Sequence, residues 1–151
     1  MTPATHLTVI SGGKKEEPQG DYIREVFGKK GHLARIIPGY VPRSGQVEMA
    51  RAIDSGIRNK VHVIAEGPTG TGKSLAYSVP ASFHASYHNL RVCIVTANKN
   101  LQRQIYEKDL EMLSRAAPWP FTYAVRKGLS SYLCERDLQK EKWRDFLMRL
   151  S

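Results

Sequence analysis

The sequence predicts an α/β fold in which helices flank a parallel β-sheet, and two observations support this class. First, short runs rich in β-branched and aromatic residues, a composition typical of buried strands, recur at 61–66, 91–97 and 121–127. Second, longer stretches with apolar residues at helical spacing separate these runs. Strands that alternate with helices pair in parallel through right-handed crossovers. The chain is therefore expected to hold one such sheet.

Length and composition are those of a globular protein. The 151 residues can fill one domain core, and 41% hydrophobic with 25% charged residues is an ordinary balance. No window approaches the roughly 18 consecutive apolar residues of a membrane helix, and the first residues lack a secretory signal. We therefore expect a cytoplasmic protein with no membrane partner. The two cysteines form no disulfide framework, and Cys93 is expected to be a buried, reduced thiol.

The chain is strongly basic. It carries 23 lysines and arginines against 14 aspartates and glutamates, a formal charge of +9 and a pI near 9.7. Such an excess favours polyanionic partners, because neutralised phosphates release counterions and give affinity without sequence preference. Many basic domains nevertheless bind no nucleic acid, so the motifs must decide.

The N-terminal part precedes the predicted sheet. Residues 1–20 mix small, polar and charged side chains with glycine and proline, which predicts a flexible leader. A short helix is predicted from Asp21; it ends at Gly28, and prolines and glycines then punctuate the chain up to Arg43. We interpret residues 21–43 as a segment that docks on the core.

Helical spacing marks the connections between the predicted strands. The stretch 45–60 is predicted to form a helix that Ser44 caps. Residues 73–89 are predicted to form a helix that is interrupted or bent near Pro80, and residues 100–116 a further helix. Apolar residues at partly helical spacing also predict a helix in the last stretch of the chain.

A glycine-rich motif lies between the first predicted strand and its helix. Residues 67–74 read GPTGTGKS and satisfy the phosphate-binding pattern G-x-x-x-x-G-K-[ST]. The glycines permit backbone conformations closed to other residues and let N–H groups approach phosphate oxygens, while the following helix directs its positive dipole end at the same anion. The candidate nucleotide-binding residues are Gly67, Pro68, Thr69, Gly70, Thr71, Gly72, Lys73 and Ser74.

Two residues of this loop are the candidate catalytic groups. Lys73 is expected to reach the β- and γ-phosphates of a nucleoside triphosphate, and the Ser74 hydroxyl to ligate Mg²⁺. Kinases, transporter ATPases, GTPases and helicases share such a loop, so the loop alone leaves all four classes open. The flanking residues have to discriminate between them.

Residues 27–134 resemble the superfamily two DNA helicases of the XPD and DinG type. EGPTGTGKSLAYSVPA is similar to helicase motif I of that family, and PGYVPRSGQVEMARAI to its nucleotide-recognition region. The resemblance places Gln46 where that family has the glutamine that reads the adenine edge, a role that suits an amide able to donate and accept at once. It implies a RecA-like P-loop NTPase domain that binds ATP and Mg²⁺.

The segment VCIVTANKNLQRQIYEKDL resembles motif Ia, which in these helicases contacts the backbone of the translocating single strand. The resemblance therefore implies contacts to single-stranded DNA at Thr96 and Asn98, and at Lys127 in the segment FTYAVRKGLSSYLCERDL. An ordinary cap of the following helix is an equal alternative for Thr96 or Asn98.

The segment with Lys127 also resembles the approach to the family's iron-sulfur insertion, and Cys134 stands at the position of a cluster ligand. A four-cysteine cluster needs three more thiolates, and Cys93 lies in a predicted strand. Two interpretations stay open. Either the other ligands lie in sequence absent from this chain, or the chain is a cluster-lacking relative in which Cys134 is a packed thiol.

The chain also departs from that family. It contains no Asp-Glu-Ala-His box, no second RecA-like domain and no arginine finger, which this architecture uses to activate water and stabilise the developing charge. Several acidic residues are possible substitutes, but none ends an apolar strand, so we interpret them as solvated helix charges. They are Asp109, Glu111, Glu135 and Asp137.

These observations define the expected organisation and function. After the leader and the docking segment come an incomplete RecA-like domain at 44–134 and a helical segment at 135–151 that begins an accessory insertion. The expected function is the ATP-binding N-terminal part of a DinG-like ATP-dependent DNA helicase acting on single-stranded or forked DNA, a fragment whose partner is the missing remainder of the motor. Alone it is expected to hydrolyse ATP poorly. The alternatives are a non-catalytic nucleic-acid- or partner-binding module and a small P-loop kinase.

Overall fold

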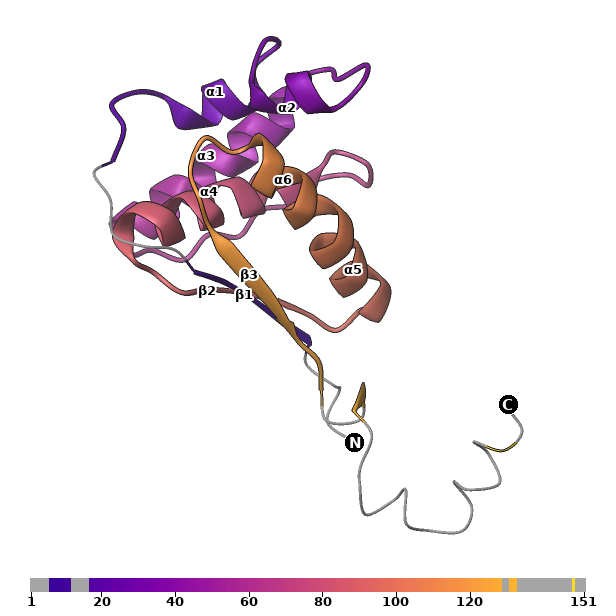
Figure 1. Ribbon diagram of the computed structural model, residues 1–151. Coiled ribbons are helices and arrows are strands. Elements are labelled where there is room, and N and C mark those ends of the chain that lie inside the picture. Colours follow the sequence, from indigo (N-terminus) through magenta and orange to yellow (C-terminus); the bar gives the residue numbers. More distant parts are fainter. Residues whose placement is uncertain (1–5, 12–16, 129–130, 133–147, 149–151) are drawn as a thin grey trace.

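The computed structural model describes residues 6–11, 17–128, 131–132 and 148. Within them a three-stranded sheet lies on one side and a layer of helices on the other (Figure 1). The strands are β1 (His6–Ser11), β2 (Val92–Thr96) and β3 (Thr122–Arg126), in the spatial order β2-β1-β3. The predicted strands 91–97 and 121–127 are therefore confirmed to within one residue at each end.

Strand β1 runs antiparallel to both of its neighbours. Val9 pairs with Cys93 of β2 and with Ala124 of β3. Strands β2 and β3 thus point the same way, as the helical crossover between them requires, but they flank β1 and do not pair with each other. The expected parallel pairing is not observed among the described strands, because β1 takes the position between the two.

The central strand lies within the stretch expected to be a flexible leader. Its sequence HLTVIS has the β-branched composition of a strand, whereas the glycines and prolines that indicated a leader all lie outside it. The overall composition of residues 1–20 indicated a leader, although six of these residues form a strand. The structure therefore differs from the expectation at residues 6–11, where backbone pairing on both sides stabilises an extended conformation.

The remaining predicted strand, at residues 61–66, forms no strand. Ile64 is fully exposed, and Val61 is more than half exposed. A β-branched run becomes a strand only when a neighbour pairs with its N–H and C=O groups, and none of the described strands lies beside this run. The prediction of a buried parallel strand is therefore wrong for this segment.

In the described part of the chain, three helices precede the glycine loop. They are α1 (Tyr22–Phe27), α2 (His32–Ile36) and α3 (Ser44–Asn59). Asp21 caps α1, because its carboxylate accepts the Arg24 N–H at 3.1 Å. Ser44 does not cap α3 as expected; it is the first helical residue, and the extended backbone that a cap position needs is found at Arg43, with φ −122°. The side chain of Arg43 makes no capping hydrogen bond.

Helix α4 (Lys73–His88) follows the glycine loop and passes through Pro80 without the expected interruption. Proline has no N–H, so one hydrogen bond of the helix is missing at this point. The side chain of Pro80 is buried, as are most residues of the second half of α4. Packing around the helix therefore holds it together where its backbone is weakest.

A helical segment with a π-helical turn connects β2 to β3. It consists of α5 (Lys99–Gln104), the π turn η1 (Ile105–Leu110) and α6 (Glu111–Ala116). Asn98 caps its beginning, because the amide oxygen accepts the N–H groups of Asn100 and Leu101 at 2.9 and 3.2 Å. The capping alternative for Asn98 is thus confirmed. A π turn inserts one residue into a helix and often occurs at a functional site.

An aromatic cluster on α4 forms the centre of the core. Phe83 stacks on Tyr22 of α1 with ring centroids 3.6 Å apart, and the Trp119 ring meets it edge-on at 5.2 Å. The indole N–H of Trp119 donates to the Ser82 hydroxyl at 3.1 Å. These contacts fix α1 and the segment before β3 on α4. Because α4 begins directly after the glycine loop, this packing also holds the end of the loop in place.

Strand β2 stands at an edge of the sheet. Helices cover only the side of Val92 and Ile94, so the alternate residues Cys93 and Val95 are exposed. Cys93 was expected to be buried, and that expectation is wrong because no described element packs on the face of β2 to which it belongs. No helix within the described residues is both long and apolar enough to cross a membrane.

Candidate functional site

The glycine loop adopts the backbone that its sequence predicts. Gly70 and Gly72 have φ angles of +80° and +79°, a region that side-chain-bearing residues rarely adopt. A Cβ atom at Gly72 would also lie 2.3 Å from the side-chain nitrogen of Gln46. The positive φ therefore favours glycine at this position, and a side chain there would also have to displace the Gln46 amide.

The N-terminus of α4 faces the loop without a side-chain cap. Gly72 occupies the N-cap position, no side-chain capping hydrogen bond is made, and the first turn contains no acidic residue. The first N–H groups of a helix need acceptors, and the dipole of this 16-residue helix adds positive potential at the same end. The local backbone thus fits an anion with several oxygens, such as a polyphosphate.

Lys73 places its ammonium group inside the loop. Its Nζ donates to the carbonyl oxygens of Gly67 and Pro68 at 2.6 and 2.8 Å. Thr71 also closes on the loop, since its hydroxyl donates to Pro68 O at 2.9 Å. Neutral carbonyls are weaker partners for an ammonium than phosphate oxygens, so an anion in the loop can exchange with them.

The beginning of α3 supports the loop from the side. Gln46 is buried, and its Nε2 donates to Gly72 O at 2.9 Å. Arg43 donates to Gly70 O. Of the two, only Gln46 was expected near a nucleotide, from the family resemblance. The structure brings them to the loop backbone, and an adenine contact of Gln46 stays a prediction.

Ser74, the candidate magnesium ligand, lies in the first turn of α4 between two other side chains. The Tyr77 phenol and the Asp109 carboxylate lie near its hydroxyl, which acts to lower the pKa of both groups. Burial raises the pKa of Tyr77, and the nearby Asp109 raises it further, so the phenol keeps its proton. Burial also raises the pKa of Asp109, although the hydrogen bond from Gln104 and the nearby Ser74 hydroxyl oppose this effect.

The burial of Asp109 corrects the sequence-based interpretation, which made it a solvated charge. Only 6% of Asp109 is exposed. It lies on η1, four residues after the buried Ile105 and four before the buried Leu113, so a buried helical face already included it in the sequence. Glu111 is exposed and pairs with Arg115, as a solvated charge should. Glu135 and Asp137 lie outside the described residues.

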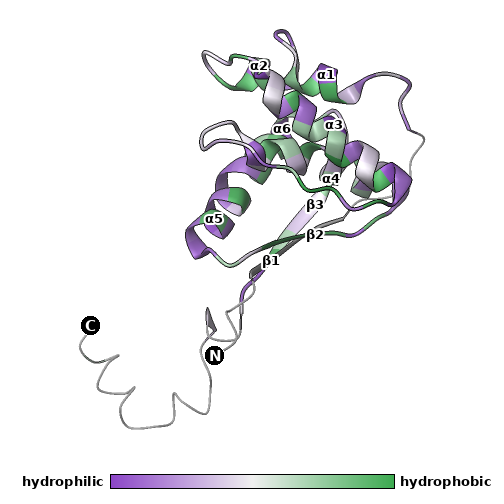
Figure 2. Ribbon diagram, turned by 180° about the vertical axis from the view of Figure 1, so that it is seen from behind, coloured by the Kyte–Doolittle hydropathy of each residue, from purple (hydrophilic) through white to green (hydrophobic). Residues whose placement is uncertain are grey.

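A second candidate site is a cavity of about 440 Å³ between α5, η1 and the end of β3. Its lining residues are Lys99, Asn100, Gln102, Arg103, Tyr106, Glu107, Val125, Lys127 and Ser131. Three of them are cationic and one is acidic. Figure 2 shows hydrophilic residues on the turns of α5, the helix that supplies Lys99, Asn100, Gln102 and Arg103 to the lining. The cavity therefore suits an anionic ligand.

Of the three predicted nucleic-acid residues, Lys127 lines this cavity, and Asn98 directly precedes the lining residue Lys99. Thr96 lines a different pocket, between α3, α4 and β2. Thr96 Oγ1 accepts the Asn98 N–H at 3.1 Å, and Asn98 caps α5. The sequence analysis missed Lys99 and Arg103. Their spacing of four residues, which places side chains on one helix face, was the available signal.

Cys134, the candidate ligand of an iron-sulfur cluster, lies outside the described residues. Within the described residues, no group of three or more histidine, cysteine, aspartate or glutamate side chains is placed to hold a metal ion.

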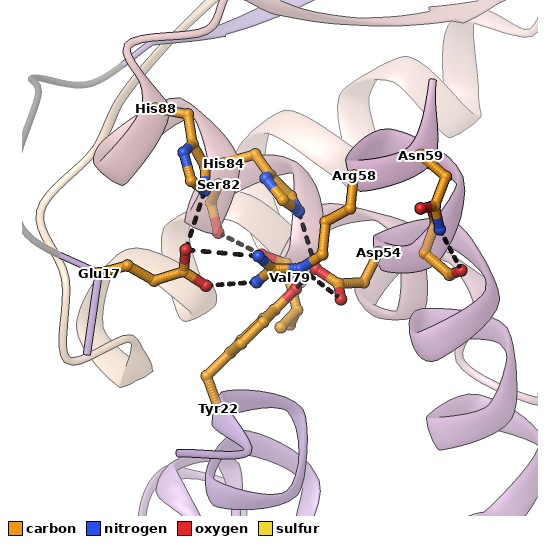
Figure 3. Close-up of polar contacts among 10 residues, drawn as sticks. Glu17, Tyr22, Asp54, Arg58, Asn59, Val79, Ser82, His84 and His88 are labelled. Atoms are coloured by element: carbon orange, nitrogen blue, oxygen red, sulfur yellow. Dashed lines mark hydrogen bonds and ion pairs between the residues drawn. The ribbon is translucent and has the colours of Figure 1, made fainter. Parts of the chain in front are cut away.

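A separate polar network lies at the other end of α4 (Figure 3). Asp54 of α3 accepts the Tyr22 hydroxyl at 2.6 Å and Arg58 Nε at 3.0 Å, and His84 Nε2 lies 2.7 Å from the same carboxylate. Glu17 pairs with Arg58. Burial raises the pKa of Asp54, but these three hydrogen bonds outweigh it and hold the pKa below its usual value. The network joins α1, α3 and α4 and is structural.

Comparison with known proteins gives relatives for most of this chain. The 3'-5' exonuclease DinG of Bacillus subtilis (strain 168) is 38% identical over 107 residues, which are 71% of this chain and 12% of that protein. The ATP-dependent DNA helicase YoaA of Escherichia coli (strain K12) is 38% identical over 115 residues, 76% of this chain and 18% of the relative. The ATP-dependent DNA helicase DinG of the same organism is 36% identical over 109 residues, 70% and 15% of the two chains. No solved structure matches.

The chain thus spans less than a fifth of the length of these relatives. The family model for the DEAD/DEAH box helicase matches residues 45–143, a range that contains the glycine loop, Asp109 and the whole lining of the basic cavity. Membership of this family implies a P-loop fold of the RecA-like type, of which the described part shows mainly the helices. Since the match covers well over half of the 151 residues, the chain belongs to the DEAD/DEAH box helicase family.

Proposed function

We propose that this chain is the ATP-binding part of a DinG-like ATP-dependent DNA helicase. The observation that carries the proposal is the glycine loop at the uncapped N-terminus of α4, with the Lys73 ammonium held inside it. The relatives whose names record ATP-dependent DNA helicases support the choice of ATP and of DNA.

Each element of the loop has a role in this proposal. The N–H groups around Gly70 and Gly72 and the first turn of α4 bind the phosphate oxygens, and Lys73 exchanges its carbonyl partners for the β- and γ-phosphates. Ser74 provides a hydroxyl oxygen for Mg²⁺, which when bound neutralises charge on the phosphates. Gln46 and Arg43 hold the loop in position.

The basic cavity is the proposed contact for single-stranded DNA. Lys99, Arg103 and Lys127 line it with positive charge, and phosphate contacts of this kind position a strand without reading its sequence. The Thr96 hydroxyl, at the end of β2, and the Asn98 side-chain amide, directly before Lys99, can extend the contact. Single-stranded or forked DNA is accordingly the proposed substrate.

Turnover requires groups beyond those described here. Water activation and stabilisation of the transferred phosphoryl group need a magnesium-binding carboxylate pair and cationic groups from an opposing domain. We propose that this chain works together with further helicase sequence, in which ATP binding closes two domains on the DNA. By itself it binds ATP weakly and hydrolyses it poorly.

The test is nucleotide binding by the chain, followed with a fluorescent ATP analogue in the presence of Mg²⁺. Lys73→Ala should weaken binding roughly 10- to 100-fold, because charge-assisted hydrogen bonds to phosphate are lost. Lys30→Ala is the matched control, since Lys30 is exposed and outside both sites. Equal affinity of the wild type and Lys73→Ala would refute the proposal. Stimulation of ATP hydrolysis by single-stranded DNA is then measured on the longest natural polypeptide that contains this chain.

A second function is favoured by the separation of the basic cavity from the glycine loop. A non-catalytic module that binds single-stranded nucleic acid would use the cavity alone and keep the P-loop fold as a scaffold. Salt-sensitive binding of a single strand that survives Lys73→Ala and is independent of nucleotide, in a polypeptide with no DNA-stimulated hydrolysis, would establish this alternative.

A further inference from the structure

The basic cavity contains an aromatic ring as well as cations. Tyr106 of η1 lines it together with Lys99, Arg103 and Lys127. Its side chain is half-buried, so part of the ring surface is open to the cavity. Contacts to the phosphates of a nucleic acid use charged and polar groups and need no such ring. The ring offers an additional, apolar surface on which a planar group can stack.

Helical spacing places Tyr106 on the same face as two of the cations. Arg103 follows Lys99 by four positions and Tyr106 follows Arg103 by three, a spacing at which side chains on a helix lie one above the other. The π turn itself is anchored by Ile105 and Leu110, which are buried in the core against α4. Tyr106, between these two residues, therefore stays partly open while the turn that carries it is held in place.

Contacts with β3 fix both the ring and the opposite wall of the cavity. The rings of Tyr106 and Tyr123 meet at 72° with their centroids 5.4 Å apart. An edge-to-face contact of this kind covers at most one face of the Tyr106 ring, so it leaves the other face for a further stacking partner. Gln102 is buried, and its Nε2 donates to Arg126 O at 3.2 Å, directly before Lys127. The cavity is therefore preformed, which lowers the cost of ordering it around a ligand.

The combination of cations and an open ring matches a single-stranded nucleic acid. Proteins that bind single strands combine a positively charged groove along the backbone with aromatic rings on which the bases stack. In a duplex each base is already stacked and paired, and taking it out costs free energy. The acidic lining residue Glu107, next to Tyr106, disfavours a phosphate at this end of the cavity. A base is therefore the better occupant beside the ring.

We propose that Tyr106 stacks on a base of the single strand whose phosphates Lys99, Arg103 and Lys127 bind. The ring makes the cavity selective for single strands over duplex, a distinction that phosphate contacts alone do not make. It gives no preference for one base, because every base has a π-face. The inference rests on the proposed function, since it takes the basic cavity as the DNA contact. It adds a specificity-determining residue to that contact.

The experiment compares three labelled DNA probes of equal length by fluorescence anisotropy. They are a strand of thymidines, a strand in which tetrahydrofuran replaces every nucleoside, and a duplex. The tetrahydrofuran strand keeps the phosphates and lacks the bases. The wild type should bind the thymidine strand about 5- to 100-fold more tightly than the base-free strand, because stacking of one base contributes that much. The ratio of these two affinities is the base preference.

Tyr106→Ala should lose most of the base preference, and its affinities for the base-free strand and the duplex should stay within about twofold of the wild type. The slope of log affinity against log salt should not change, because no phosphate contact is removed. Tyr106→Phe keeps the ring and should match the wild type. Tyr87→Ala is the matched control, since it removes another half-buried tyrosine, from α4 and outside the cavity, and should keep the preference.

Three results would overturn the inference. A wild type that binds the thymidine and base-free strands equally, with strong salt dependence, makes no use of the bases; the phosphate contact then stands and this inference alone fails. An undiminished preference in Tyr106→Ala assigns the stacking to another residue. An equal loss of preference in Tyr87→Ala assigns the effect to a general loosening of the fold. If the wild type binds none of the three probes, the proposed DNA contact itself fails, and this inference fails with it.

A measurement on the wild type keeps the test decisive if Tyr106→Ala does not fold. A strand in which every base is 5-iodouracil should crosslink to Tyr106 on irradiation, because the stacked base lies in contact with the ring, and mass spectrometry of the digested protein identifies the residue. Unmodified thymidine strand in excess should suppress the crosslink, and the base-free strand at the same concentration should suppress it much less. Crosslinks that do not include Tyr106 contradict the inference.

Discussion

The side-chain amide of Gln46 donates a hydrogen bond to the carbonyl oxygen of Gly72 at 2.9 Å. The same two residues are in close steric contact, since a Cβ at Gly72 would lie 2.3 Å from the amide nitrogen of Gln46. Gln46 lies in the first turn of α3 and Gly72 is the N-cap residue of α4, so this contact sets how the glycine loop lies between the two helices. Several consequences can be measured.

Gln46→Ala should weaken nucleotide binding about three- to tenfold, which corresponds to the loss of one neutral hydrogen bond that supports the loop. Because the amide donor is engaged with Gly72, ATP and GTP analogues should lose affinity by the same factor. Titration of both nucleotides checks this. A loss confined to ATP would instead support contact of Gln46 with the adenine.

Gly72→Ala should abolish measurable nucleotide binding and lower the melting temperature. A left-handed conformation costs an alanine roughly 1–2 kcal/mol, and the clash with Gln46 adds to it. Gly45→Ala is the matched control, because nothing lies within 4 Å of its Cβ position and the residue is in α3. Alanine there should stabilise the helix by up to about 1 kcal/mol. Thermal unfolding measures both variants, and melting temperatures that both rise or both fall would contradict the argument.

Tyr22→Phe should destabilise the fold by about 1.5–3 kcal/mol at neutral pH. The substitution keeps the stacking on Phe83 and removes only the hydroxyl that donates to the Asp54 carboxylate at 2.6 Å, a hydrogen bond to a charged group. Urea unfolding measures the loss. In Asp54→Asn the same substitution should cost less, and an unchanged cost would show that the carboxylate is not the relevant partner.

Acidification should lower the free energy of unfolding in two stages. Burial lowers the pKa of His84 below its ordinary 6.5, although Asp54 opposes this, so the unfolded chain takes up a proton first and stability begins to fall below pH 6.5. The depressed pKa of Asp54 has the same sign, and its contribution is lost as the pH falls below 3.8. Urea unfolding between pH 7.5 and 5 checks the first stage.

Two histidine variants isolate the first stage. His84→Gln should reduce the dependence of stability on pH between about 7 and 5.5, because the group responsible for it is gone. His62→Gln changes an exposed histidine and should keep the wild-type dependence. A wild type whose stability is constant over this range would contradict the assignment.

Arg103→Ala should weaken binding of single-stranded DNA and reduce the slope of log affinity against log salt by about one unit, because one phosphate contact is lost. Lys127→Ala should act in the same way, since both side chains line the basic cavity. Lys30→Ala leaves the cavity unchanged. Fluorescence anisotropy at several salt concentrations measures the slopes, and equal slopes in Arg103→Ala and Lys30→Ala would exclude the cavity as the DNA contact.

The sequence by itself determined the features that depend only on residues adjacent along the chain. The glycine loop and its helix follow from residues 67–74, since glycine conformations and helix polarity are local properties. The strands at 92–96 and 122–126 were likewise evident from short β-branched runs. The identity of the family was accessible for the same reason, because the glycine motif and the helix that follows it lie within one short stretch.

Only the tertiary structure decided which of these runs pair and which charges are buried. Residues 6–11 became the central strand and residues 61–66 none, because pairing depends on the neighbours that the fold supplies rather than on composition. Asp109 is buried because η1 packs on α4 beside Ser74, and Cys93 is exposed because the outer face of β2 is uncovered. Burial depends on contacts between segments that are distant in sequence. A local pattern contains only one of the two segments that form each contact, so it cannot predict whether the contact forms.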